Sequence, residues 1–575
     1  MPHDRDLKLT RSQDGPRRRA PRSGITASLA GVLIMALAAL FPIGYAAVRT
    51  IVWCIRASEG RVPGPTELTL VPPWIVLART LGYVGLISLL STALALPGAL
   101  VLARGGRAAR WLAPLIAVPL FMPSYLAYAG WGLLRAPRTW LGNWLSSGPN
   151  HVVELKFLIA NHAMAIWGLA LWSFPIAAYV MAMYFRSIPA DTIDAARLDA
   201  PPRSSRPSPA AVARYASFRF RLLVPGLASA AALVALVMLG SVVPLDVAQV
   251  NTYSIRLLRR VTESQYIESA WAFAWPMYAI AIAAAMVVTR RLCGEHGLDP
   301  ARERVAAPRP GAGLRPIALS VLILLAATLV PVTMYLSHLR GVGDAASWSR
   351  VLDQSKAFWR DARPGVFTSA RVGAVAALVG VALTIAVWRI VSSAPASGRS
   401  AGMRVLRGLT VVFLIGALLP GVFVGSSTAS AWTALAPYVR PRPGWLLVVL
   451  AHVARFGAVG VLLGWWVAAR ELPAVRDLRR LDGAMTGRAW WLAVGAARWP
   501  VALAAGVAVF ALSLHEIEAT VLVQPPGPQA LSQSLLAALH FARDDYLAAA
   551  VVNLLALTGL LGMGVSGLYM SAARK

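Results

Sequence analysis

Twelve apolar windows, most of about twenty residues or more and with few or no charged side chains, constrain this chain more than any other feature. A helix of about 20 apolar residues is long enough to cross a hydrocarbon core about 30 Å thick. The sequence therefore predicts an all-α, polytopic membrane protein with about twelve transmembrane helices. The windows lie at residues 27–48, 81–103, 111–134, 157–184, 222–245, 267–289, 316–336, 369–390, 408–434, 445–467, 500–523 and 546–570.

Lipid is the expected solvent for most of the chain. Hydrophobic residues make up 57% of it and charged residues 14%, against about 45–50% and about 25% in a soluble domain. The net charge of +30 raises the question of nucleic acid binding. The basic residues, however, lie in short clusters between the apolar windows rather than in one arm with interleaved aromatic residues. This pattern is typical of charges that set membrane topology, and it argues against a nucleic acid partner.

The distribution of Lys and Arg predicts that both termini are cytoplasmic. With the N-terminus inside, 35 of these residues fall on the cytoplasmic side and 19 outside, and Arg455 lies inside the tenth window. Cytoplasmic loops carry such an excess of positive charge. The apolar stretch after the basic tail is about 22 residues long, against about 7–15 in a cleavable signal peptide, so we expect an uncleaved first helix.

The second half of the sequence repeats features of the first. Thr80 opens the second window and Thr368 opens the eighth, 288 residues later. Because the repeat contains six helices, both halves keep the same orientation, which implies a pseudo-twofold axis along the membrane normal with a pathway between the halves. Two further matches pair Ile188-Pro189 with Leu472-Pro473, and Leu198-Asp199-Ala200 with Leu481-Asp482-Gly483.

These features predict four parts of the chain. They are a basic cytoplasmic tail at 1–26, a first six-helix repeat at 27–295, a cytoplasmic linker at 296–315 and a second six-helix repeat at 316–575.

The loop between the fourth and fifth helices of each half reads as a short cytoplasmic helix. Pro189 and Pro473 stand near the first helical position, where proline loses no hydrogen bond. Acidic side chains follow, and they suit the positive end of a helix. These acids are Asp191 and Asp194 in the first copy and Asp477 in the second.

These loops resemble the coupling loop of binding-protein-dependent ABC permeases, which is written as EAA, three residues, then Gly. The passage from Leu481 to Gly527 is similar to the fused, two-repeat permeases of the iron(III) type. The sequence departs from that pattern at Asp194, which replaces Glu, and at Ala200, which replaces Gly. The resemblance implies that the loops contact an ATPase through Asp194, Ala195, Ala196, Asp199 and Ala200, and through Asp477, Leu481, Asp482 and Gly483.

By this resemblance, the chain is the permease of an ATP-driven importer in the bacterial inner membrane. The implied partners are a cytoplasmic ATP-binding subunit in two copies, a periplasmic substrate-binding protein and membrane lipid. The implied cargo is a small solute, with ferric iron as the best candidate. No Gly-Lys pair exists for a phosphate-binding loop, so we expect ATP hydrolysis on a separate subunit and no enzymatic activity or cofactor here.

Polar residues within the windows are candidates for the translocation path, because charged side chains are rare in membrane helices. Glu516 lies deep in the eleventh window, and alignment of Pro225 with Pro500 makes Ser241 its counterpart. His515 and Glu518 flank Glu516, but on a continuous helix they point away from it, so no metal site is expected. An alternative role for Glu516 is structural packing.

Two other function classes remain open. An ion-coupled secondary transporter would use twelve helices in two halves and place buried acids facing each other. A membrane-embedded transferase of lipid-linked sugars would need acids at helix ends, and the long loop at 337–368 supplies Asp344, Asp353 and Asp361.

Overall fold

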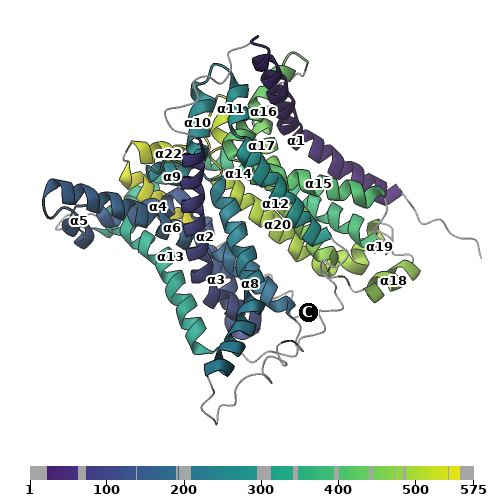
Figure 1. Cartoon of the computed structure of the whole chain (residues 1–575), viewed down its shortest axis with the longest axis horizontal. Helices are drawn as coiled ribbons and strands as arrows, with labels where there is room; N and C mark the ends of the chain where they lie inside the picture. The colour runs from purple at the N-terminus through teal and green to yellow at the C-terminus, as the bar shows by residue number, and fades with distance from the viewer. Residues whose placement is uncertain are drawn as a thin grey trace, which may run out of the picture.

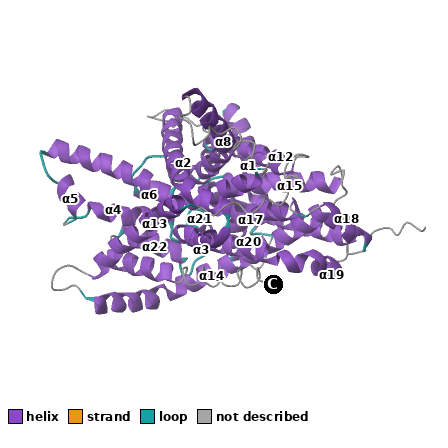
Figure 2. Cartoon of the chain, turned by 90° about the horizontal axis from the view of Figure 1, so that it is seen from below, coloured by secondary structure: helices purple, strands orange, loops and turns teal. Residues whose placement is uncertain are grey.

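The computed structural model describes most of the chain, and every regular element in the described part is a helix (Figure 2). It is therefore an all-α protein, as the apolar windows predicted. The described residues are 23–61, 73–137, 139–188, 192, 209–293, 313–340, 347–393, 401–438, 444–469, 471, 473–482, 487–541 and 543–556.

Nine helices in the described part are long and apolar enough to cross a membrane, and up to eleven if each of two bent pairs is one span. The chain is thus a multi-pass membrane protein, and the first eleven windows each contain one of these candidates. The twelfth window is described only up to residue 556. The unbent candidates lie in α1 (Ser23–Ser58), α2 (Pro73–Arg104), α6 (Asn150–Ser187), α8 (Pro209–Leu239), α13 (Leu314–Arg340), α14 (Trp348–Ser393), α15 (Ala401–Leu418), α17 (Leu446–Ala469) and α20 (Ala496–His515).

Prolines account for breaks in the third helix of each half. The first is the bent pair α3–η1 (Gly106–Ala117, Val118–Phe121) and α4–η2 (Ser124–Gly132, Leu133–Arg135), whose parts differ in direction by 82°. Pro123 has an extended backbone before α4, and Pro420 has the same conformation between α15 and α16 (Gly421–Leu435). Proline cannot donate the backbone hydrogen bond that a continuous helix requires.

The expected long external loop at 337–368 is mostly helical, which corrects the sequence-based assignment. α13 continues to Arg340, and α14 begins at Trp348 and runs for 46 residues. At about 1.5 Å per residue this length far exceeds a hydrocarbon core of about 30 Å. Val351, Phe358 and Ala362 are buried at helical spacing along this extension, and their periodicity explains why it is a helix.

Three helices of each predicted half contact one another. α2, α6 and α8 contact one another, as do α14, α17 and α20. The first helix of each predicted half packs largely across to the other half (Figure 1). α1 contacts α14, α15, α16 and α17 as well as α11 (Ile267–Phe273), and α13 contacts α2, α3, α4 and α6 as well as α14. This exchange joins the halves into one body.

Small residues allow the closest helix contacts in the second half. A Cβ atom on Gly464 of α17 would lie 2.7 Å from the carbonyl oxygen of Thr384 on α14, which is too close for any side chain. Such small residues let membrane helices approach and gain van der Waals contact. α14 and α17 therefore form a tightly packed pair.

Candidate functional site

α8 and α20 end at matching places between the two halves. The expected windows continue to 245 and 523, but α8 ends at Leu239 and α20 at His515. The next turn closes in the same way in both, because Ser241 N donates to Met238 O at 3.1 Å and Glu516 N donates to Ser513 O at 3.4 Å. The two windows were therefore predicted too long.

Each break is followed by a very short helix and then a longer one. These are α9 (Val243–Val247) and α10 (Tyr253–Glu263) in the first half, and α21 (Thr520–Val523) and α22 (Leu531–His540) in the second. Hydroxyl groups on α2 and α14, the second helix of each half, bind the first residues of the two longer helices, α10 and α22. Thr80 Oγ1 accepts from Tyr253 N at 2.8 Å, and Ser369 Oγ accepts from Leu531 N at 2.9 Å. Similar contacts thus hold the start of α10 and the start of α22.

Glu516 is buried and paired with Arg455. Arg455 Nη1 lies 2.6 Å from both carboxylate oxygens, and Ala519 N donates to Oε1 at 2.8 Å. The carboxylate can accept the Ala519 amide because α20 ends at His515 and the chain turns back. A buried charge requires such partners, since its desolvation is otherwise costly.

Glu518 belongs to the same site, contrary to the expectation that it points away from Glu516. Its Oε2 lies 3.4 Å from Arg455 Nη1, and its Oε1 accepts a hydrogen bond from Val242 N at 2.5 Å. The helical spacing rule fails here because these residues follow the helix. We call Arg455, Glu516 and Glu518 the charge cluster.

The charge cluster links the two halves. Arg455 and both acids belong to the second half, while Val242 follows the break of α8 in the first half. Gly421, at the start of α16, makes room for it: a Cβ atom there would lie 2.7 Å from Glu518 Cβ and would also collide with the Arg455 guanidinium. Glycine is therefore required at this position.

The other two predicted path residues are His515 and Ser241, which precede Glu516 and Val242 in the sequence. His515 ends α20, and Ser241 is half-buried beside Val242; the described side-chain hydrogen bonds of the charge cluster involve neither. His452, one turn from Arg455, instead supports the cluster: its Nε2 lies 2.9 Å from Thr520 Oγ1, and that hydroxyl donates to Glu516 O at 2.9 Å.

The second predicted coupling loop contains the expected short helix. α18 (Pro473–Leu481) begins at the predicted proline, and Asp477, Leu481 and Asp482 are exposed. Gly483 lies outside the described residues. So do Asp194, Ala195, Ala196, Asp199 and Ala200 of the first loop.

A buried ion pair holds α18 against the transmembrane helices. Arg479 Nε lies 3.1 Å from Glu471 Oε1, and both side chains are almost fully buried. Arg479 Nη2 also donates to Ser392 O, at the end of α14, at 2.9 Å. Trp490, in α19 (Gly487–Trp490), donates through Nε1 to Ser392 Oγ at 3.2 Å.

Three apolar side chains of α18 are exposed beside the exposed acids. Val475, Leu478 and Leu481 are 45%, 60% and 83% exposed, at a spacing that places them along one side of the helix. Within the described residues, one side of α18 is held by the ion pair and these apolar side chains lie on its exposed side.

Neither metal chemistry nor a known relative identifies the site. No group of three or more His, Cys, Asp or Glu side chains in the described part of the chain is placed to hold a metal ion. Comparisons with protein-family models, with curated proteins and with solved structures found nothing that matches this chain.

Proposed function

We propose that this chain is the membrane-spanning permease of an ATP-driven importer. The observation that carries the proposal is α18, a short helix held by a buried ion pair on one side, with exposed apolar side chains on the other. Exposed leucines of this kind suit a groove in a soluble partner, because their burial there is favourable. The proposed partner is a cytoplasmic ATP-binding subunit, present in two copies because the chain has two repeats.

The contacts of α18 provide a route for the movement. Glu471 follows α17 and Ser392 lies at the end of α14, so a displacement of α18 acts on both helices together. From Arg455 to its end at Ala469, α17 spans about 21 Å at about 1.5 Å per residue. Closure of the ATPase would then shift α14 and α17 as one body and disturb the charge cluster between the halves.

The remaining features of the proposal come from the resemblance and from charge. The protein would lie in a bacterial inner membrane with both termini in the cytoplasm, and a periplasmic binding protein would deliver the cargo. Two carboxylates share one guanidinium, so the ionised charge cluster carries one net negative charge. Such a site favours a cationic cargo, and ferric iron remains the proposed one.

Substitution of the two most exposed leucines of α18 tests the proposal. Leu478→Asp combined with Leu481→Asp should abolish co-purification of the ATPase and stop uptake, while the permease still inserts. Leu314→Asp is a matched control, since Leu314 is 82% exposed at the start of α13. Unchanged co-purification in the double variant would refute a docking role for α18.

A second candidate is ion-coupled secondary transport. The specific observation in its favour is that Glu516 and Glu518 are buried and share Arg455 within the helix bundle. Uptake by proteoliposomes separates the two candidates. The importer requires the ATPase with ATP and tolerates a protonophore, whereas the secondary transporter needs the ion gradient and no ATP.

A further inference from the structure

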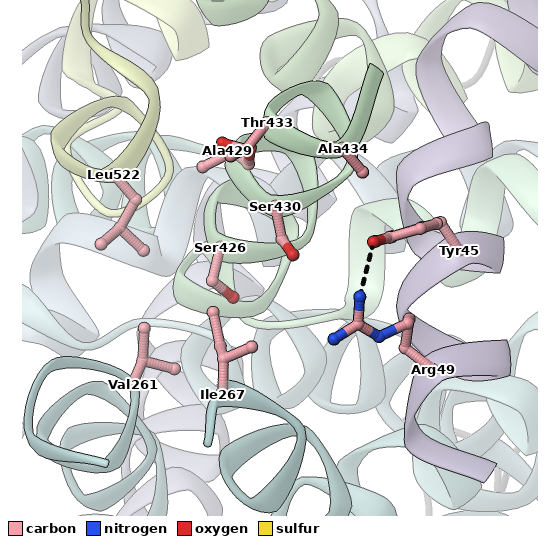
Figure 3. A pocket seen from close by; sticks show the side chains of 10 residues that line it. All are labelled: Tyr45, Arg49, Val261, Ile267, Ser426, Ala429, Ser430, Thr433, Ala434 and Leu522. Atoms are coloured by element: carbon pink, nitrogen blue, oxygen red, sulfur yellow. Dashed lines mark hydrogen bonds between the residues drawn. The ribbon is translucent and has the colours of Figure 1, made fainter. Parts of the chain in front are cut away.

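A cavity of about 500 Å³ lies between α1 and α16 (Figure 3). Helices from both halves line it, including α10, α21 and α11 (Ile267–Phe273). Its volume is in the range of small-molecule sites, and it combines apolar walls with a few convergent polar groups. It is therefore a candidate binding site that the proposed transport function leaves unexplained.

The polar side of the cavity centres on Arg49. Arg49 Nη1 donates to Tyr45 OH at 3.0 Å, and Nη2 contacts the buried carboxylate of Glu268. Arg49 is nevertheless half exposed, so these contacts orient the guanidinium without enclosing it. Ser430 on α16 lines the same space, whereas the Ser426 hydroxyl is buried and bonded to Trp271 and to Phe423 O (Figure 3). A fixed guanidinium beside a hydroxyl group matches the oxygens of a phosphate ester.

The surroundings of Arg49 indicate that the ligand comes from the membrane. Val48, Ile51 and Ile55 are 62%, 60% and 53% exposed on α1, on either side of Arg49 along the helix. Such large apolar side chains are expected to face lipid within a span of this length. Val261 and Leu522 add apolar surface on the side of the cavity away from α1 (Figure 3).

We propose that this cavity binds the headgroup and glycerol region of a phospholipid. The phosphate would lie on Arg49, and the part of the acyl chains nearest the glycerol would lie along the apolar wall. An arginine between transmembrane helices can bind a lipid headgroup in this way, and Arg49 is half exposed although it contacts Glu268. The site would tie α1, which crosses to the second half, to α16 through the bound lipid. Its function is independent of the transported solute.

The test compares two substitutions that a purely structural ion pair would not distinguish. Arg49→Gln should reduce phospholipid retention roughly tenfold, as expected for loss of a charged hydrogen bond, in native mass spectrometry of the purified protein. Glu268→Gln frees the guanidinium from its carboxylate and should leave retention equal or higher. Arg56→Gln is the control, since Arg56 is exposed two turns further along α1 and does not line the cavity.

Three results would overturn the proposal. Equal lipid retention in the Arg49→Gln and wild-type proteins would remove the headgroup site. Equal loss in Arg49→Gln and Glu268→Gln would make the pair purely structural. Binding of soluble glycerol 3-phosphate without any retained phospholipid would reassign the cavity to a soluble phosphate ester. If either single variant fails to fold, the double variant Arg49→Gln with Glu268→Gln, which removes both charges, supplies the lipid measurement, and wild-type retention in it would reject the site.

Discussion

Two buried sets of arginine and glutamate lie on α17 and its neighbours, and they do different things. Glu471 pairs with Arg479, eight residues later, and also lies 3.8 Å from Arg476, so two arginines of the short helix α18 share one carboxylate. Arg455 is shared by Glu516 and Glu518, more than sixty residues away. The first set is local and carries one arginine in excess. The second is long-range and carries one carboxylate in excess.

The two sets also differ in what depends on them. Breaking the local pair releases one surface helix, whose partners are the ends of α14 and α17. Breaking the charge cluster affects the contact between the halves, because Glu518 reaches the backbone of Val242. The comparison teaches that similar ion pairs can serve as a local attachment in one place and as a connection between halves in another.

Arg455→Met should have the largest effect on stability. It leaves two buried carboxylates without a cation, and breaking a buried ion pair in this way costs about 3–5 kcal/mol. The measurement is the thermal unfolding midpoint in detergent. Adding Glu516→Gln and Glu518→Gln to the Met variant should restore most of the loss. A midpoint equal to that of the wild type for Arg455→Met would show that the cluster does not stabilise the contact between the halves.

Gly421→Ala should cost less, about 1–3 kcal/mol, because the added methyl group overpacks the site. The Cβ atom would lie 2.7 Å from Glu518 Cβ. Rotation of the Glu518 side chain cannot relieve this contact, because the position of a Cβ atom is set by the backbone. Gly408→Ala is the matched control on α15, where a Cβ atom meets nothing within 4 Å. The control should be neutral or slightly stabilising, since alanine favours helices. Equal midpoints for the two variants would contradict the assigned crowding at Gly421.

Much of the fold could be predicted from the apolar windows, because long uncharged segments have few alternatives in lipid. The predicted windows ran past the ends of α8 and α20, since Val242, Val243 and Leu245 keep the sequence apolar after the helix has stopped. Pro244 was the available signal for the first break, because its ring conflicts with a helical carbonyl four residues earlier. No comparable proline marks the end of α20.

The candidate site was predicted only in part. Glu516 was identified as a buried acid, but its partners were missed because Glu518 was judged on helical spacing that ends at His515. The signal for Arg455 was present in the sequence: one arginine deep in the tenth window and two acids in the eleventh would be expected to pair. The contact with Val242 could not be predicted, since it depends on how the halves meet.

Glu471→Gln should act locally and leave the bundle intact. Arg479 would lose its carboxylate but keep the carbonyl of Ser392, so α18 should open more often. Amide hydrogen exchange in residues 473–482 should become faster, while exchange in α17 near Arg455 stays the same. If the thermal midpoint falls as far as in Arg455→Met, the distinction between a local attachment and a connection between halves is wrong.

The smallest effect on stability is expected for Glu518→Gln, and it sharpens the comparison by separating charge from contact. The amide oxygen of Gln can still accept from Val242 N, and the remaining Glu516 balances Arg455, so removal of the excess charge should be nearly neutral for folding.

Transport should respond differently to Glu518→Gln. If the cargo is a cation, loss of the net negative charge removes a Coulomb attraction that is strong in a partly desolvated site, and the maximal uptake rate should fall. Glu516→Gln neutralises the same charge but also loses the closest contacts to Arg455, so it should lower both stability and uptake. For an anionic cargo both changes should leave uptake unchanged or raise it. Uptake by both variants with the ATPase still bound gives the sign of the cargo charge, and the same unchanged rate for cationic and anionic solutes would leave the charge cluster with a structural role alone.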